Sequence, residues 1–285
     1  RLYARGSADM KSFLGVVLAK AADMVAQPLA EPIHLALSYD EEVGCVGAVD
    51  LVDELARRGG LPRGCVVGEP TSMRIVRGHK SMNVFRIDVR GVAAHSSLTP
   101  QGENAVVAGA RLVQFVQGVA DEMREQGPFD DGYVVPYTSV SVNRIDGGIA
   151  VNTIPAECSI HFEFRALTTV DHAALVQRFV DECARVETDM RSRFPEASVT
   201  LVTTAAAPGV DTPADAEIVA LAAEWGAVPS DEKVTYGTEA GLFANAGIPT
   251  IVCGPGDIAQ AHAPDEFIDL EQIAACEAFV DALVA

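Results

Sequence analysis

The sequence has no closely spaced pair of cysteines. The six cysteines form no Cys-x-x-Cys motif, which argues against a disulfide framework and against a cysteine-rich zinc module. Most of them lie among apolar residues, where cysteine acts as a small core residue. No apolar run is long enough to span a bilayer. These absences predict a protein of the reducing cytoplasm.

Basic residues are also scarce. Lys and Arg number 21 against 40 Asp and Glu, which gives a formal net charge of -19. This excess of acid excludes nucleic acid and an anionic membrane as expected partners. The acidity serves solubility in most proteins, and the alternative is that part of it attracts metal ions and a cationic substrate.

Residues 1–77 predict an α/β arrangement. Apolar residues recur at helical spacing over 9–25, and a short apolar run over 33–39 predicts a buried strand. A helix is predicted over 43–58 and a strand over 65–68. Strand, helix and strand in this order imply a right-handed parallel crossover, with ligands expected beyond the carboxyl ends of the strands.

A different pattern begins near residue 80. The predicted order, β-α-β-β-α-β, is that of a ferredoxin-like domain. The elements are strand 82–89, helix 104–125, strands 137–145 and 158–165, helix 171–191 and strand 198–203. We therefore predict an inserted domain over 78–204, which divides a catalytic domain into 1–77 and 205–285.

The last segment resumes the α/β pattern. Helices are predicted over 214–225, after Gly237 and from Leu270, and a strand over 250–253. The expected fold class is α/β, with a mostly parallel central sheet and an inserted ferredoxin-like domain. The strand leads into Gly254-x-Gly256-x-x-Ala259, which matches a dinucleotide-binding fingerprint. We disfavour nucleotide binding, because the residues that follow break the helix that this fingerprint requires.

Acids and one histidine gather at the expected edge of the sheet: Asp9, Glu41, Glu42, Glu69 and His262. Taken singly, each has a commoner structural role, such as a helix N-terminal charge or a solvated turn. Their convergence instead favours a pair of divalent cations, since carboxylate and imidazole ligands suit zinc, manganese or cobalt. Asp9 is the candidate for a bridging ligand, and Glu41, beside the ligand Glu42, is the candidate general base.

Several motifs resemble those of one enzyme family. They are Gly-Glu69-Pro-Thr, Arg77-Gly-His79-Lys80, Ala94-His95-Ser96-Ser97, Tyr236-Gly-Thr-Glu239-Ala-Gly and Gly254-Pro-Gly. The chain resembles, over essentially its whole length, the dinuclear zinc amidohydrolases that include acetylornithine deacetylase, succinyl-diaminopimelate desuccinylase, aminoacylase and the glutamate carboxypeptidases. The acetylornithine deacetylase branch is the most similar.

The resemblance implies roles for individual residues. Asp9 would bridge the two metals, Glu42 and His262 would hold one ion, Glu69 would hold the other, and Glu41 would be the general base. The fold it implies is that of a zinc-peptidase-like catalytic domain with an inserted lid that also dimerises.

Further implied roles concern the substrate. His95 would reach the active site of the partner subunit and stabilise the oxyanion. Asn152 and Arg165 would form a substrate-holding pair, with Arg165 suited to an α-carboxylate. Backbone amides of Gly254 to Gly256 would bind the same carboxylate. Glu239 either meets the cationic end of the substrate or is a helix N-terminal acid.

The implied function is hydrolysis of N-acetylornithine to ornithine and acetate, a step of arginine biosynthesis, by a cytoplasmic zinc-dependent homodimer. Cobalt or manganese are alternative metals. A related desuccinylase, aminoacylase or dipeptidase is the alternative within the family, and a catalytically inactive dimerising fragment is the alternative outside enzymes.

Two features depart from the family pattern. The family has a further metal-ligating histidine, in a His-x-Asp segment, upstream of the Asp9 motif, and this chain has no such segment. We therefore expect the chain to be truncated at its N-terminus, with one metal lacking a ligand. Ser81 also replaces the glycine expected after Gly-His-Lys.

Overall fold

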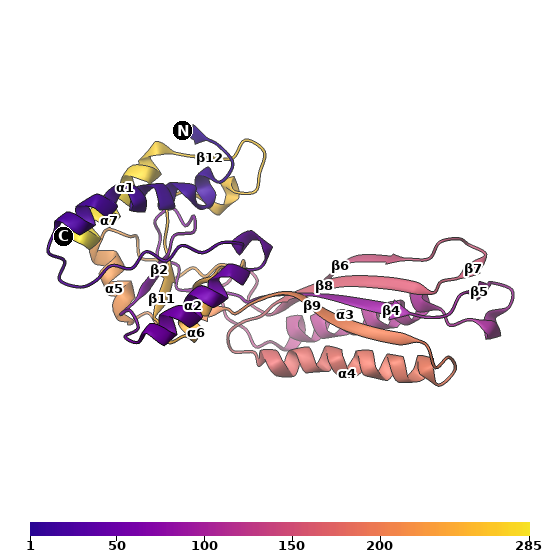
Figure 1. Ribbon diagram of the computed structural model, residues 1–285. Coiled ribbons are helices and arrows are strands. Elements are labelled where there is room, and N and C mark those ends of the chain that lie inside the picture. The colour runs from indigo at the N-terminus through magenta and orange to yellow at the C-terminus, as the bar shows by residue number, and fades with distance from the viewer. The chain divides into compact units, whose positions relative to one another are not determined.

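The computed structural model describes residues 1–285, which divide into two compact units (Figure 1). Unit 1 comprises Arg1–His79 and Ala207–Ala285, and unit 2 comprises Lys80–Ala206. Each unit has buried hydrophobic clusters of its own. The assignment of domain boundaries at 78 and 204 stays a prediction.

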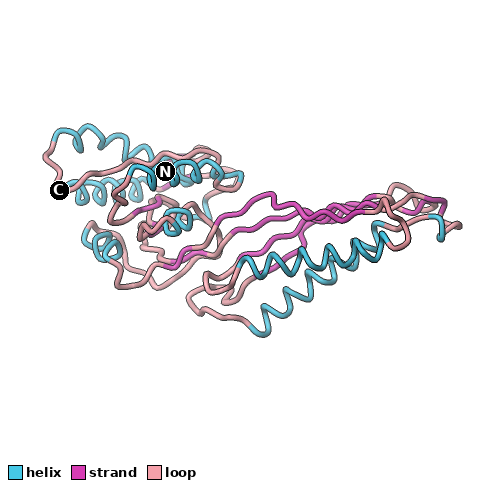
Figure 2. Tube along the Cα trace, turned by 60° about the horizontal axis from the view of Figure 1, so that its bottom comes forward, coloured by secondary structure: helices cyan, strands magenta, loops and turns pink.

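Unit 2 is built on a four-stranded sheet with the strand order β6-β8-β4-β9. The strands are β4 (Met82–Arg90), β6 (Ser139–Gly147), β8 (Glu157–Arg165) and β9 (Ser198–Ala207). Helices α3 (Ala105–Gln126) and α4 (His172–Arg191) lie along the same side of this sheet (Figure 2). The chain order β4-α3-β6-β8-α4-β9 is the predicted ferredoxin-like order, which is confirmed.

Alternation of apolar side chains fixes which face of the unit 2 sheet is covered. Every second residue of β4 and β8 is buried, as expected for strands with one face against helices. The ring of Phe162 lies 5.1 Å from that of Phe85 and 4.9 Å from that of Phe179 on α4. Asp171 caps α4 by accepting a hydrogen bond of 3.0 Å from the Ala174 N–H. Aromatic packing therefore holds α4 on the sheet, and the cap stabilises the first turn of the helix.

Lys80 is a fully buried lysine in unit 2. Its Nζ donates to the Tyr137 carbonyl at 2.5 Å and lies 5.4 Å from the centre of the Tyr133 ring. Burial lowers the pKa of Lys80 to about 8, although Asp130 acts in the opposite direction. The charged form is thus disfavoured in the folded protein.

Lys80 is expected to make the stability of the protein rise with pH above 8. Its folded pKa of about 8 lies below the ordinary 10.5, so between these values the unfolded chain binds more protons and the free energy of unfolding increases. The free energy of unfolding of wild type, relative to that of Lys80→Met, should rise by about 1–3 kcal/mol from pH 7.5 to 10. Denaturant titrations across this range measure it, and a constant difference would contradict the prediction.

Unit 1 contains a short parallel ladder between β2 (Cys65–Val67) and β11 (Thr250–Val252). Helices α1 (Ser12–Ala26) and α7 (Leu270–Val284) pack against each other, and α2 (Val46–Arg58) packs against α6 (Ala240–Asn245) (Figure 1). The remaining elements are β1 (Leu2–Tyr3) with β12 (Phe267–Ile268), β3 (Gly78–His79) with β10 (Val210–Asp211), and α5 (Glu217–Glu224). In unit 2, β5 (Ala94–His95) pairs with β7 (Thr153–Ile154).

Two local predictions for unit 1 are wrong. Segment 33–39 forms no strand, and Leu35, Leu37 and Tyr39 are exposed. None of the strand ladders includes this segment: β2 pairs with β11, and Val252 of β11 also bridges to Val76. The first helix starts at Ser12 rather than near Asp9, whose φ of -117° and ψ of 97° are not helical.

All six cysteines are free, and five of them are buried. None of the helices combines the length and the apolar character that crossing a membrane requires.

Candidate metal centre

Asp9 is held in position by a buried carboxylate from the other end of the sequence. It lies in the turn Ser7–Lys11 before α1, where its own backbone is not helical, and its side chain is 13% exposed. Glu266, which is 4% exposed, accepts hydrogen bonds from the N–H groups of Gly6 (2.8 Å), Ala8 (2.9 Å) and Asp9 (3.3 Å). Three backbone donors on one carboxylate fix the path of this loop.

Glu42 and His262 come from tight turns. Glu42 lies in the single 3-10 turn Glu41–Val43, which is flanked by Asp40 and Gly44, both with positive φ. His262 follows β11 and a short 3-10 turn, and its own φ is 55°. A positive φ in a non-glycine residue requires support from its surroundings. The turns set the directions of these two side chains.

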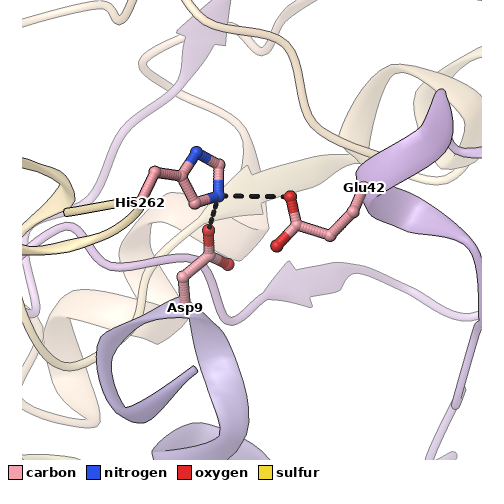
Figure 3. Close-up of side chains that lie close together, drawn as sticks. All are labelled: Asp9, Glu42 and His262. Carbon is pink, nitrogen blue, oxygen red and sulfur yellow. Dashed lines mark ion pairs between the residues drawn. The ribbon is translucent and has the colours of Figure 1, made fainter. Parts of the chain in front are cut away.

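The side chains of Asp9, Glu42 and His262 converge (Figure 3). The His262 Nε2 atom lies 3.0 Å from Asp9 Oδ2 and 3.1 Å from Glu42 Oε2. One ligand atom from each residue lies within 4.8 Å of the other two. Two carboxylates and an imidazole form a donor set that suits zinc, cobalt or manganese.

Two further acids, Glu41 and Glu69, lie near this cluster. Burial, together with the charges of Asp9, Glu42 and Glu239, raises the pKa of Glu41 to about 7. Burial also raises the pKa of Glu69, with Asp9 and Glu41 acting in the same direction. The charged neighbours with the largest effects on both groups are acids. A divalent cation would offset this repulsion and return the carboxylates to their ionised forms, so the residues fit a metal.

The thiol of Cys45 contacts the expected general base. Its Sγ donates to Glu41 Oε1 at 3.6 Å, and burial followed by the Glu41 charge raises the pKa of Cys45. The thiol therefore stays protonated and serves as a weak donor to the carboxylate.

Gly254 and Gly256 do not offer free amides. The Gly254 N–H donates to Thr71 Oγ1 at 3.2 Å, and the Gly256 N–H donates to Gln272 Oε1 at 3.2 Å. A Cβ at Gly254 would lie 2.1 Å from the Gly68 carbonyl oxygen. This glycine thus permits close approach of the loops that follow β2 and β11, and the amides of both glycines are already bonded within the chain instead of facing a substrate.

His95, Asn152 and Arg165 belong to unit 2. The Ser96 N–H donates to the Asn152 carbonyl at 3.0 Å, so His95 and Asn152 lie together beside the β5–β7 ladder. Arg165 lies at the far end of β8, where it pairs with Glu163 at 2.9 Å. The nine residues of β8 separate the two places by about 30 Å. Within one chain, Asn152 and Arg165 lie too far apart to hold one small substrate together, so the pair stays a prediction that would need two subunits.

Sequence reasoning missed Glu266. Only the Pro-Asp-Glu that follows His262 hinted at it, and its role depends on contacts with residues at the opposite terminus. Burial alone would raise the pKa of Glu266, but the three backbone donors and Arg5 lower it overall. The carboxylate is therefore ionised and stabilises the loop that presents Asp9.

The variant Glu266→Gln is expected to weaken metal binding without removing a metal ligand. The amide NH₂ of glutamine would face N–H groups that now donate to a carboxylate, so the Asp9 loop loses its fixed position. We expect metal affinity to fall about 10–100-fold and the free energy of unfolding to fall by about 2–3 kcal/mol. Zinc titration calorimetry and denaturant unfolding measure these effects. Unchanged zinc affinity in a folded variant would refute the role.

Comparison with known proteins gives a consistent result. The model of the family "Peptidase family M20/M25/M40" matches residues 1–285. The acetylornithine deacetylase of Myxococcus xanthus is 36% identical over 286 residues, which cover 100% of this chain and 72% of that protein. The acetylornithine deacetylase of Proteus mirabilis is 31% identical over 270 residues, which cover 95% of this chain and 67% of that protein.

Solved structures share the fold. The aminopeptidase PepT of Bacillus cereus matches with a TM-score of 0.71 at 20% identity, over 97% of this chain and 70% of that one. The metallo-carboxypeptidase Sso-CP2 of Sulfolobus solfataricus matches with a TM-score of 0.70 at 16% identity, over 99% of this chain and 76% of that one. At these identities the likeness concerns the fold alone.

Proposed function

The chain belongs to peptidase family M20/M25/M40 and is an amidohydrolase, and from this we propose that it hydrolyses N-acetylornithine to ornithine and acetate. The observation that carries the proposal is the convergence of Asp9, Glu42 and His262. The identity of 36% to an acetylornithine deacetylase across the whole chain supports the choice of substrate. In a cell, this reaction would serve arginine biosynthesis in the cytoplasm.

The metal ligands of the proposal are the residues named above. Asp9, Glu42 and His262 hold one divalent ion, and Asp9 with Glu69 contributes to a second, zinc being the metal we favour over cobalt or manganese. When bound, the ions supply positive charge that acidifies water and polarises a carbonyl. Their binding also leaves Asp9, Glu42 and Glu69 ionised, since an adjacent cation favours the charged form of a carboxylate.

Glu41 is the general base of the proposal. Its carboxylate takes a proton from the attacking water and then gives that proton to the leaving amine. The water oxygen forms a bond to the acetyl carbon, which gives a tetrahedral oxyanion. The C–N bond then breaks as the nitrogen receives the proton from Glu41, and the acetic acid released loses its own proton to solvent to become acetate. Cys45 orients the carboxylate through its thiol, and partial burial keeps Glu41 responsive to the charge around it.

Residues of unit 2 complete the proposal through a homodimer. His95 and Asn152 lie at one end of unit 2 and Arg165 at the other, so contributions from two subunits would bring both ends to one substrate. His95 would donate to the developing oxyanion, and Arg165 would bind the α-carboxylate. The exposed edge strand β6 supports pairing between copies, since it is bonded to β8 alone.

Substrate profiling of the purified full-length protein tests the proposal. With zinc present, kcat/KM for N-acetylornithine should exceed that for N-succinyl-diaminopimelate and for dipeptides by about 100-fold or more. A preference for one of the latter would favour the related desuccinylase or dipeptidase. If the protein hydrolyses none of the N-acyl amino acids and mass spectrometry finds no bound zinc, a non-catalytic dimerising protein is favoured.

A further inference from the structure

Glu239 is a buried carboxylate that the structure satisfies on only one side. The residue is 7% exposed, and its Oε2 accepts a hydrogen bond of 2.7 Å from Ser38 Oγ. Its Oε1 is buried and has no hydrogen-bond partner. A buried carboxylate oxygen without a donor is costly, so a donor absent from the chain itself is expected there.

A role at the start of α6 does not account for Glu239. Its side chain makes no capping hydrogen bond. The N–H of Ala240, the first residue of the helix, donates to Thr238 Oγ1 at 3.1 Å. The helix has only six residues, which leaves little dipole to favour an acid. The second alternative from the sequence, a contact with the substrate, is therefore the better account.

Glu239 flanks the metal ligands without joining them. Its charge raises the pKa of Glu41 and of Glu69, so it lies close to the general base and to a metal ligand. Its oxygens are not part of the group in which Asp9, Glu42 and His262 come within 4.8 Å of one another. An ion held by that group would leave Oε1 without a partner.

We propose that Glu239, oriented by Ser38, is the residue that selects substrates with a side-chain ammonium group. This inference rests on the proposed function and deepens it by assigning the source of its specificity. An ammonium at the end of a flexible chain reaches a carboxylate beside the reacting centre and donates to Oε1. A neutral side chain of equal length leaves Oε1 unpaired in a dry site, and such a site rejects an analogue that lacks the donor.

The variant Glu239→Gln separates recognition from chemistry. We expect its kcat/KM for N-acetylornithine to fall about 100-fold, the effect of losing a buried hydrogen-bonded charge pair. For N-acetylnorvaline, which lacks the amine, kcat/KM should stay within about twofold, since no contact is lost. Ser38→Ala should lower the same selectivity by a smaller factor. Glu224→Gln, at an exposed acid on α5, is the matched control and should change neither substrate.

A binding measurement makes the test independent of turnover. Calorimetry on the zinc-loaded protein should show tighter binding of ornithine than of norvaline, and Glu239→Gln should abolish that preference while zinc content stays unchanged. Equal loss on both substrates, loss of zinc, or a preserved preference would each overturn the inference.

The two proposals fail separately. A wild type that cleaves no N-acyl amino acid, yet prefers ornithine through Glu239, would refute the reaction and keep the recognition site. A wild type that cleaves N-acetylornithine, with selectivity unchanged in Glu239→Gln, would refute only the recognition site.

Discussion

The variant Glu41→Gln is expected to lose hydrolysis by a factor of about 10²–10⁴ in kcat, the usual contribution of a general acid–base group. Glutamine has nearly the same shape as glutamate and can still accept from the Cys45 thiol, so the turn at Glu41–Val43 should keep its structure. It cannot take up a proton from water. Metal binding should persist, because Glu41 is not among the three converging ligands.

Steady-state kinetics, zinc analysis and thermal unfolding measured together check this prediction. Asp40→Asn is the matched control, because it removes an adjacent charge at a position whose positive φ asparagine tolerates. Control activity should stay near wild type. If Glu41→Gln lost zinc along with activity, Glu41 would be a ligand instead of the base.

The same role for Glu41 predicts the direction in which kcat/KM changes with pH. Burial and neighbouring acids raise the pKa of Glu41 to about 7 in the metal-free protein, and bound cations lower it, since they favour the carboxylate. Wild-type kcat/KM should therefore rise with pH along an acid limb whose midpoint lies below 7. That limb should disappear in Glu41→Gln. A limb that persists unchanged would assign it to another group.

Unit 2 could be predicted closely from the sequence because its signals are local. Strands β4 and β8 alternate apolar and polar residues along their whole length, and period-two alternation identifies a strand with one covered face. Helix α4 has its cap in Asp171, also a local signal. The order of six such elements was then enough to indicate the ferredoxin-like arrangement.

Segment 33–39 shows where such reasoning fails. Its apolar run has the composition of a strand, yet a strand also needs a neighbour to complete its hydrogen bonds. Whether a neighbour is present depends on the rest of the chain. In this structure no strand pairs with the segment, and its apolar side chains stay partly exposed.

The same difference between local signals and tertiary contacts applies to the residues of the candidate site. Chemical type and loop position were enough to bring Asp9, Glu42 and His262 forward as a group, and the structure places them together. The supporting residues were not accessible in this way. Glu266 acts through the backbone of residues about 260 positions away, and Ser38 acts on a carboxylate 201 positions away. Contacts of this kind follow from the tertiary fold and leave no periodic signal.

Most substitutions destabilise a protein, but the variant Asp9→Asn is not expected to lower the stability of the metal-free protein. The charge of Asp9 raises the pKa of Glu41 and of Glu69, so its removal relieves repulsion. Without metal, the variant should be at least as stable as wild type. With zinc at 100 times its dissociation constant, wild type should gain about 2.7 kcal/mol, or about 5–10 °C in Tm for a unit of this size. The variant should gain almost nothing.

The two arms of this comparison isolate charge from coordination. Asparagine keeps the shape of the side chain, and the Glu266 hydrogen bonds to the loop do not involve the Asp9 carboxylate, so the fold is retained in both states. Asp50→Asn on the exposed side of α2 removes the same charge elsewhere and should leave the zinc response intact. Thermal unfolding in EDTA and in zinc gives all four values. Full zinc stabilisation in Asp9→Asn would show that the converging carboxylates bind no ion in common. A variant that is at least as stable as wild type in EDTA but less stable in zinc is expected only if Asp9 both repels its neighbours and ligates the metal.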